Sequence, residues 1–332
     1  MIDEPRISIV LTSHDSRNAK RITDTIESFR AQRYQKKELV VIIEGSEELS
    51  RVIKCESELG PQNSVKRYMI SAGAGASTAR NFGIRQSSGD VISFVDDDVI
   101  IAEDWAEQVA KTFALNASCI GLIGPVLPLW QEPHMDWFPD ELLWLVSCTG
   151  WLSYQGIVPI RGHTWTSNAS FRREAFSDET MFSEDLGPRG GVPGWRRHSI
   201  SEDVELSVRT QKRSGKVVLY NPQVKVWKYV EPSVLSWPHI KDCALGIGAS
   251  RVTKRQLLST EGMNAFSLEE KLLKRILLRL LPLSVVATLA GRNSSRRRLL
   301  LILFTLFFLS IGYARGIVSQ NRARRQPKPQ AW

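Results

Sequence analysis

The chain has 332 residues, and its 44 Lys and Arg against 35 Asp and Glu give a formal net charge of +9. Hydrophobic residues make up 42% of the chain and charged residues 24%, which excludes a disordered or collagen-like protein and indicates a globular one with a large core. The positive charge favours an anionic partner, such as a phosphorylated small molecule, an acidic lipid surface or nucleic acid. Four widely separated cysteines exclude a zinc ribbon or a disulfide scaffold and indicate a reducing compartment.

Up to about Tyr220, short β-branched runs alternate with helical stretches, which predicts an α/β fold with a mostly parallel central sheet. The first apolar run, Ile7–Thr12, has the length of a strand and is too short for a signal peptide. We expect strands at 7–12, 38–43, 67–71, 91–95 and 120–126, and helices at 18–32, 47–59, 76–86 and 103–115. Ligands bind where the carboxyl ends of parallel strands open into loops, so the turns Glu44–Ser46 and Asp96–Asp98 should lie at one edge of the sheet.

The stretch Leu127–His163 is rich in Trp and Pro and has no clear period. It is either an insertion whose aromatic side chains pack over the core, or a cap that faces a substrate, because aromatic faces suit sugar rings and lipid interfaces. A second segment, Gly187–Gly191, has the composition of a flexible loop and is a candidate lid. A helix is expected from about Ser201 to Arg213.

The C-terminal region has two segments with membrane character. Residues 268–281 place apolar side chains on one face of a helix and basic ones on the other, and Pro282 is expected to end or kink that helix. Such a helix either packs on the folded body or lies in the headgroup layer of a membrane. The uncharged segment Leu299–Ala314 would rise about 24 Å as a helix, against a ~30 Å hydrocarbon core. We expect membrane attachment here, followed by a disordered basic tail at 322–328.

Three adjacent carboxylates, Asp96, Asp97 and Asp98, follow the apolar strand at 91–95. Like charges this close repel one another, so they need either a cation or full solvation. Mg²⁺ and Mn²⁺ prefer carboxylate oxygens and often share their remaining positions with phosphates. The triplet therefore indicates either a divalent-ion site or an acidic turn on the surface.

Two helix starts carry further candidate residues. Arg80 follows the small residues Gly73–Ala76, where it can bind a phosphate or a ribose, or form a structural ion pair. Asp203 lies in the acidic run Ser201–Leu206, where it either caps the start of a helix or supplies a general base. The residue type and position alone do not decide between the two roles of Arg80 or between those of Asp203.

Taken in order, five segments resemble the motifs of family 2 glycosyltransferases: Ile7–Thr12, Ala79–Gly83, Gly89–Asp98, Asn168–Arg173 and Ser201–Leu206. The similarity covers roughly residues 6 to 255. The last two segments and the apolar C-terminus also resemble archaeal membrane-associated enzymes that assemble lipid-linked glycans for protein N-glycosylation. The resemblance implies a single Rossmann-like glycosyltransferase A-type catalytic domain at 1–260. An amphipathic helix, a hydrophobic membrane segment and a basic tail would follow at 265–332.

The same resemblance implies roles for individual residues. Asp98 would lie nearest a divalent ion, Mn²⁺ or Mg²⁺, with Asp96 as its second ligand, and Asp203 would be the general base. The nucleotide-sugar donor would contact Thr12, Glu44, Arg80, Asp96 and Asp97. Asn168, Glu202 and Lys228 would lie near the acceptor or behind the residues that contact the ligands. The family usually has paired aspartates where Ile43 and Glu44 stand, and often a histidine where Lys228 stands; a lysine there could pair with a phosphate.

The implied activity is an inverting hexosyl transfer from a nucleotide sugar to a hydroxyl of a lipid-linked glycan. The alternative is a membrane-bound protein that binds nucleotide sugars without transferring them. A nucleic-acid partner is not expected, because the basic residues concentrate after residue 250, beside apolar helices rather than in a motif that reads DNA or RNA. We expect the chain at the cell membrane, with its catalytic domain in the cytoplasm where nucleotide sugars are made.

Overall fold

A computed structural model of the chain describes residues 4–14, 19–53, 64–150, 152, 154–160, 164–177, 181–184, 202–260 and 267–325. Contacts divide the chain into two compact units. The first unit comprises Met1–Gln131, Ser147–Gly191 and Glu202–Val230. The second unit comprises Glu132–Val146, Val192–Ser201 and Glu231–Trp332.

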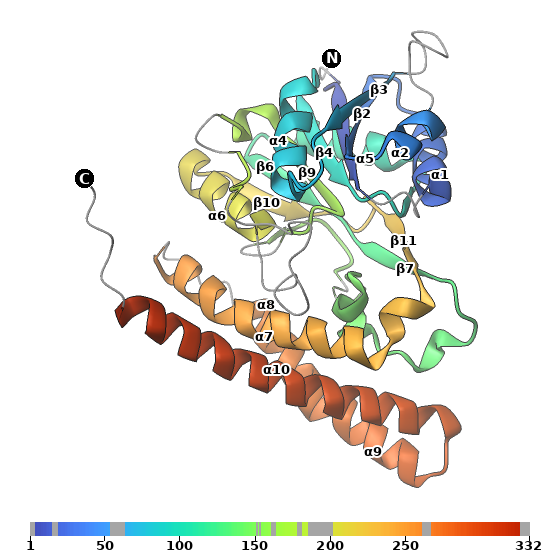
Figure 1. The fold of residues 1–332 in the computed structure, drawn as a ribbon, viewed down its shortest axis with the longest axis vertical. Helices are drawn as coiled ribbons and strands as arrows, with labels where there is room; N and C mark the ends of the chain where they lie inside the picture. The colour runs from blue at the N-terminus through green and yellow to red at the C-terminus, as the bar shows by residue number, and fades with distance from the viewer. Residues whose placement is uncertain are drawn as a thin grey trace. The chain divides into compact units, whose positions relative to one another are not determined.

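The first unit is built on an eight-stranded sheet in the order β3-β2-β1-β4-β9-β6-β10-β8 (Figure 1). Its strands are β1 (Ile7–Ser13), β2 (Lys37–Glu44), β3 (Val65–Ile70), β4 (Val91–Val95), β6 (Cys119–Ile123), β8 (Val158–Ile160), β9 (Asn168–Arg172) and β10 (Val217–Tyr220). Strands β3, β2, β1 and β4 are parallel neighbours, and β9 runs antiparallel between β4 and β6. The predicted α/β fold with a mostly parallel sheet is therefore confirmed.

Helices and short helical turns join these strands. They are α1 (Ala19–Arg30), α2 (Glu47–Val52), α4 (Ala76–Gln86), α5 (Trp105–Leu115), η5 (Arg173–Ala175) and α6 (Glu202–Ser214). Helix α4 and strand β4 match the predicted bounds, since each has clear flanking turns. The buried residues of α1, such as Ile22, Ile26 and Phe29, recur three or four positions apart, which gives the helix one apolar face for the core.

The strand predicted at 120–126 is in fact two strands, β6 and β7 (Val126–Trp130), which belong to different sheets. A Cβ atom added at Gly124 would lie 1.7 Å from the carbonyl oxygen of Val224, so only glycine allows the two backbones to approach here. Pro125 has no N–H to continue a ladder. The chain consequently leaves the large sheet between Ile123 and Val126 and enters a smaller one.

The smaller sheet has three strands, β5 (Val99–Ile101), β11 (Val226–Val230) and β7, in the order β5-β11-β7. Strand β11 is antiparallel to β5 and parallel to β7. In this register Lys228 lies opposite Val99 on one side and Pro128 on the other. The Tyr229 N–H donates to the carbonyl oxygen of Asp98 at 2.9 Å, which fixes β11 beside the acidic turn.

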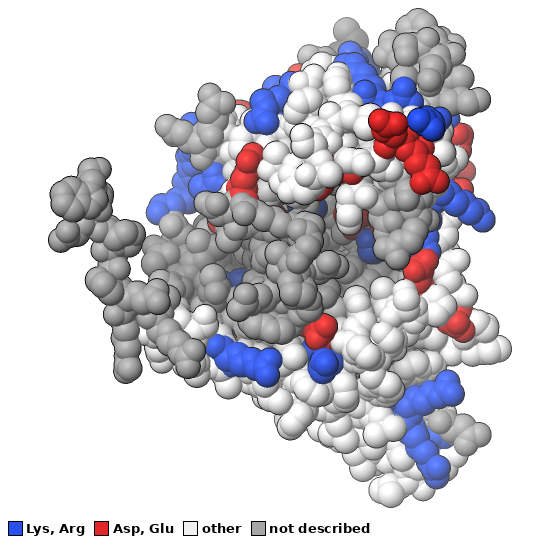
Figure 2. Space-filling model, in the orientation of Figure 1, with Lys and Arg blue, Asp and Glu red and all other residues white. Residues whose placement is uncertain are grey.

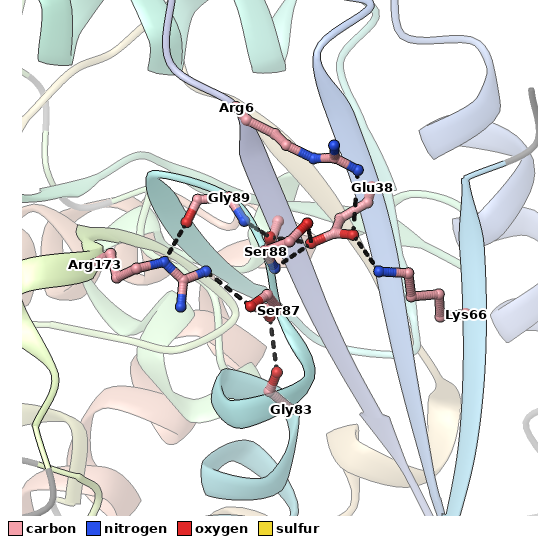
Figure 3. A network of polar contacts seen from close by, with 9 residues as sticks. Arg6, Glu38, Lys66, Gly83, Ser87, Ser88, Gly89 and Arg173 are labelled. Carbon is pink, nitrogen blue, oxygen red and sulfur yellow. Dashed lines mark hydrogen bonds and ion pairs between the residues drawn. The ribbon is translucent and has the colours of Figure 1, made fainter.

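A buried carboxylate ties the amino ends of the parallel strands together (Figure 3). Glu38 on β2 has a fully buried side chain that accepts hydrogen bonds from Ser8 Oγ at 2.5 Å and from the Ser88 N–H at 2.6 Å. Lys66 on β3 donates to it at 2.8 Å, and Arg6 lies 3.4 Å away. One side chain therefore links β1, β2, β3 and the turn before β4.

The second unit is helical. It contains η3 (Met135–Trp137), η4 (Asp140–Val146), η7 (Pro232–Leu235), α7 (Trp237–Thr260), α8 (Ser267–Arg275), a π-helical segment η8 (Ile276–Leu280), α9 (Leu281–Leu289) and α10 (Asn293–Arg325). Helices α7 and α10 lie side by side (Figure 1). Cβ atoms added at Gly248 and Gly312 would lie 2.2 Å from the carbonyl oxygens of Leu309 and Leu245, so glycines on both helices permit this close packing.

Pro282 does not end the helix predicted around 268–281. It stands in the first turn of α9, and the π-helical segment Ile276–Leu280, whose hydrogen bonds follow a different pattern, directly precedes it. The helix thus continues past the proline with altered hydrogen bonding at that point.

The aromatic stretch predicted as one insertion at 127–163 is divided between the two units. Residues 132–146 join the second unit, where Glu141 lies 2.6 Å from Arg275 and Arg298 donates to the carbonyl oxygen of Trp137 at 2.9 Å. The chain passes from the first unit to the second after Val230, and α7 packs on α10 within the second unit.

Replacing Glu38 should show how much its charge stabilises the sheet. Burial alone would raise the pKa of Glu38, but hydrogen bonds from Lys66, Ser8 and Ser88 lower it to about 2. A carboxyl whose pKa falls on folding stabilises the protein above its unfolded pKa and loses that effect as the pH falls. We expect Glu38→Gln to lower the free energy of unfolding at pH 7 by roughly 2–3 kcal/mol, a difference that shrinks between pH 4.5 and pH 2.

Urea unfolding of the full chain in detergent measures this difference. The control is Glu174→Gln, because the Lys216–Glu174 ion pair is exposed and should contribute about 1 kcal/mol or less. Equal effects of the two substitutions would contradict a stabilising role for the buried charge.

Candidate active site

The acidic turn follows β4 at the carboxyl edge of the large sheet, and its three side chains have different partners. Asp97 accepts a hydrogen bond from Ser13 Oγ at the end of β1. Burial and the neighbouring charge of Asp98 raise the pKa of Asp97 to about 6. Asp96 accepts a hydrogen bond from Ser167 Oγ at 2.6 Å. Neither serine was among the predicted site residues, although Ser13 directly follows the first predicted strand and Ser167 directly precedes the Asn168 motif.

Lys228 lies between the other two aspartates. Its Nζ is 2.8 Å from Asp96 Oδ2 and 2.5 Å from Asp98 Oδ1, and its side chain is only 13% exposed. Burial alone would lower the pKa of Lys228, but the two carboxylates raise it above its usual value. Burial likewise opposes ionisation of Asp96, yet Lys228 keeps the pKa of Asp96 below its usual value. The ammonium group is therefore the counter-charge of this turn.

The side chains of the acidic turn can be compared with the ligands that a divalent ion prefers. Asp96 and Asp98 supply the carboxylate oxygens that Mn²⁺ and Mg²⁺ prefer. The ammonium of Lys228, however, bonds to both of them and is itself positive. Among the described residues, no group of three or more His, Cys, Asp and Glu side chains is arranged to hold a metal. As arranged here, the three side chains do not fit a divalent ion.

A buried ion pair connects α4 with the start of α6. Arg80 Nη1 lies 2.9 Å from Glu202 Oε1, and the two side chains are 10% and 8% exposed. The guanidinium also stacks over the ring of Phe182, and its charge contributes to the lowered pKa of Asp96. Arg80 therefore links the acidic turn to the helix that carries Asp203.

Asp203 is half-buried in the first turn of α6. Its Oδ1 accepts a hydrogen bond from the N–H of Val204 at 2.8 Å, a contact at the helix start. The free N–H groups of a helix N-terminus stabilise an ionised carboxylate. The geometry is thus compatible with both predicted roles, a cap and a base.

The remaining predicted residues lie at different depths. Thr12 is half-buried near the carboxyl end of β1, and Glu44 at the end of β2 accepts from the Gly75 N–H at 3.3 Å. Asn168 is fully buried: its Oδ1 accepts from Trp105 Nε1 at 2.9 Å, and its Nδ2 donates to the carbonyls of Pro125 and Val224. The Asn168 amide therefore holds together the segments that carry Trp105, Pro125 and Val224. The candidate lid 187–191 lies outside the described residues.

Comparisons with known proteins agree with this architecture. The model of the family described as Glycosyl transferase family 2 matches residues 8–178. Over 221 residues, the chain is 27% identical to the glucosyl-dolichyl phosphate glucuronosyltransferase of Haloferax volcanii, which covers 67% of this chain and 68% of that protein. The family match ends before α6, so Glu202, Asp203 and Lys228 lie beyond it.

Two solved structures share the fold. The mannosyltransferase PcManGT from Pyrobaculum calidifontis, in complex with GDP-Man and Mn²⁺, superposes with a TM-score of 0.60 at 13% identity, covering 94% of this chain and 88% of that one. TarS 1-349 of S. aureus, in complex with UDP-GlcNAc, superposes with a TM-score of 0.52 at 14% identity, covering 96% and 92%. These similarities confirm the predicted glycosyltransferase A-type fold.

A double-mutant cycle tests the Arg80–Glu202 pair. Removing one partner leaves a buried charge uncompensated, so Arg80→Met and Glu202→Leu should each lower the free energy of unfolding by roughly 3–5 kcal/mol. The double variant should lose much less than the sum, because neither charge of the pair is then left buried without its partner.

Urea unfolding in detergent provides the measurement, and the Arg209–Glu205 pair on α6 provides the control. That pair is more exposed, and its coupling should be about 1 kcal/mol or less. Strictly additive losses at Arg80 and Glu202 would show that the two charges do not depend on each other.

Proposed function

Because the chain belongs to glycosyl transferase family 2, we propose that it is an inverting transferase that moves a sugar from a nucleotide-sugar donor to a hydroxyl of a lipid-linked glycan. One observation carries the proposal: the acidic turn at the end of β4, with Lys228 on two of its carboxylates, is linked through Arg80 to the start of α6, next to Asp203. A donor bound at this turn would contact the positive charge of Lys228, and Asp203 would be the base for the acceptor.

The donor diphosphate is negatively charged, and the leaving nucleotide gains further charge as the bond from its phosphate oxygen to the anomeric carbon breaks. Lys228 bonds to the turn, and the charge of Arg80 also acts on Asp96. Positive groups fixed in a partly buried site stabilise such charge strongly. We place the nucleoside near Thr12, Glu44 and Asp97, which lie at the carboxyl ends of β1, β2 and β4. The GDP-Man and UDP-GlcNAc complexes of proteins with this fold support a nucleotide-sugar donor.

The expected divalent ion, Mn²⁺ or Mg²⁺, would be held by Asp98 and Asp96 and would offset the charge of the diphosphate. The Mn²⁺ in the PcManGT complex supports such an ion in proteins with this fold. In this chain Lys228 bonds to the same carboxylates, so the transfer we propose uses its ammonium and has no step that depends on a metal.

Asp203 is the proposed general base. The acceptor hydroxyl oxygen attacks the anomeric carbon from the side opposite the leaving phosphate, while its proton moves to the Asp203 carboxylate. One direct displacement inverts the configuration at that carbon, so the enzyme needs no nucleophile of its own. The N-terminus of α6 would hold Asp203 ionised and ready to accept the proton.

The acceptor side of the proposal rests on the second unit and on a relative. The Haloferax protein is named for a glucosyl-dolichyl phosphate substrate, a membrane lipid. In this chain, residues Ser294–Asn321 of α10 form an apolar helix long enough to cross a membrane. Leucines on the adjoining segments are exposed, including Leu278 at 77% and Leu289 at 82%. Over α9 and the nearby end of α10, Figure 2 shows mostly uncharged surface with blue basic side chains.

We propose that these apolar surfaces attach the protein to the cell membrane, with the catalytic unit in the cytoplasm. Helix α7 covers one face of α10 through the contacts at Gly248 and Gly312, which leaves the other face for lipid. The lipid-linked acceptor would then reach the enzyme from the same membrane. The proposed partners of the protein are accordingly the nucleotide sugar, the lipid-linked glycan and membrane lipids.

Asp203→Asn should separate the base from the cap. The substitution keeps the shape of the side chain but removes its ability to take the acceptor proton, so kcat should fall by at least ~10²-fold while donor binding is nearly unchanged. Turnover of nucleotide sugar and binding of nucleotide by the full chain measure the two effects. The control is Glu205→Gln, an acidic residue of the same helix that pairs with Arg209. If Asp203→Asn destabilises the protein but the molecules that stay folded keep full kcat, Asp203 is a helix cap and not the base.

Extraction from membranes tests the attachment. High salt screens charges but does not weaken apolar burial, so the full chain should stay with membranes in high salt and be released by detergent. Replacing Leu278, Leu289 and Phe307 with Gln should weaken binding to lipid vesicles, whereas Leu115→Gln, an exposed leucine of the first unit, should not. Release by salt alone would contradict apolar attachment.

A further inference from the structure

Lys228 is held on the acidic turn by its backbone as well as by its charge. Its strand, β11, is the central strand of the small sheet and pairs with β5 and β7 on its two sides. The next residue, Tyr229, donates its N–H to the carbonyl oxygen of Asp98 at 2.9 Å. The Lys228 backbone therefore cannot move away from the turn unless these pairs break, and its ammonium stays within reach of both carboxylates.

The Lys228 ammonium and a divalent ion would both need the carboxylate oxygens of Asp96 and Asp98. Lys228 donates to Asp96 Oδ2 and Asp98 Oδ1 at 2.8 and 2.5 Å, and a divalent ion at this turn would take lone pairs of the same carboxylates. Two positive charges cannot occupy one place between two partly buried side chains, because they repel each other and compete for the same oxygens. Occupation by one therefore excludes the other.

We propose that Lys228 is the resident cation of the donor site and competes with a divalent ion for Asp96 and Asp98. This inference rests on the proposed transfer from a nucleotide sugar and makes it more specific. With Lys228 in place, its ammonium supplies the positive charge that faces the donor diphosphate, and transfer proceeds without added metal. Without Lys228, the two carboxylates become a divalent-ion site, and activity comes to depend on Mn²⁺.

A purely structural role for Lys228 gives a different outcome. If the lysine only holds β11 against the turn, its loss should destabilise the protein without creating any response to metal. The matched control is Lys66→Gln, because Lys66 also lies 2.8 Å from a buried carboxylate, that of Glu38, at the other end of the strands. Each substitution removes one ammonium, Lys66 from the Glu38 carboxylate and Lys228 from those of Asp96 and Asp98, but only Lys228→Gln changes the proposed donor site.

The first experiment measures transfer from nucleotide sugar by the full chain in EDTA and in Mn²⁺. The wild type and Lys66→Gln should be equally active in both. Lys228→Gln should lose ~10²-fold in EDTA, the usual loss when one charge-stabilising group is removed, and should recover in Mn²⁺. Loss of wild-type activity in EDTA would overturn the proposal.

The second experiment measures binding of Mn²⁺ alone by calorimetry and thermal unfolding, which does not require activity. Mn²⁺ should bind Lys228→Gln and raise its unfolding temperature, because an ion that binds only the folded state stabilises that state. It should leave the wild type and Lys66→Gln unchanged. Failure of Lys228→Gln to bind Mn²⁺ would also overturn the proposal. If no variant transfers sugar under any condition, the proposed function fails, and the Mn²⁺ binding still decides whether Lys228 and the metal compete.

Discussion

One ammonium group between two carboxylates is the interaction on which the site depends. Three adjacent aspartates follow the fully buried strand β4, and without a counter-charge their repulsion would oppose folding at that point. Lys228 supplies that charge to Asp96 and Asp98, while Asp97 turns to Ser13 instead. The small sheet holds Lys228 in position, because its register places Lys228 opposite Val99, the residue that follows the acidic turn.

The two edges of the parallel strands have different electrostatics. At the amino edge, Glu38 is fully buried and its oxygens accept bonds from several groups of the protein, which suits a permanent link between strands. At the carboxyl edge, Asp96, Asp98 and Lys228 remain partly exposed, and their charges can be shared with a ligand. The first arrangement holds the sheet together, and the second leaves it able to bind a charged donor.

Local patterns were sufficient to predict β4 and α4 to the residue, because a short apolar run and a helix flanked by small residues leave few alternatives. They were also sufficient to identify the acidic turn. They did not reveal that Lys228 bonds to Asp96 and Asp98, which lie 132 and 130 residues away along the chain. Nor did they reveal the Arg80–Glu202 pair, or the role of Gly124 in dividing a predicted strand, since both depend on contacts between distant segments.

The donor diphosphate should bind at the acidic turn beside Lys228. A crystal structure of the full chain with a nucleoside diphosphate, grown without divalent ions, would show where it binds. We expect phosphate oxygens within hydrogen-bonding distance of Lys228 Nζ, next to Asp96 and Asp98. A diphosphate bound elsewhere, for example in the cavity lined by Glu174, Arg213 and Lys216, would contradict it.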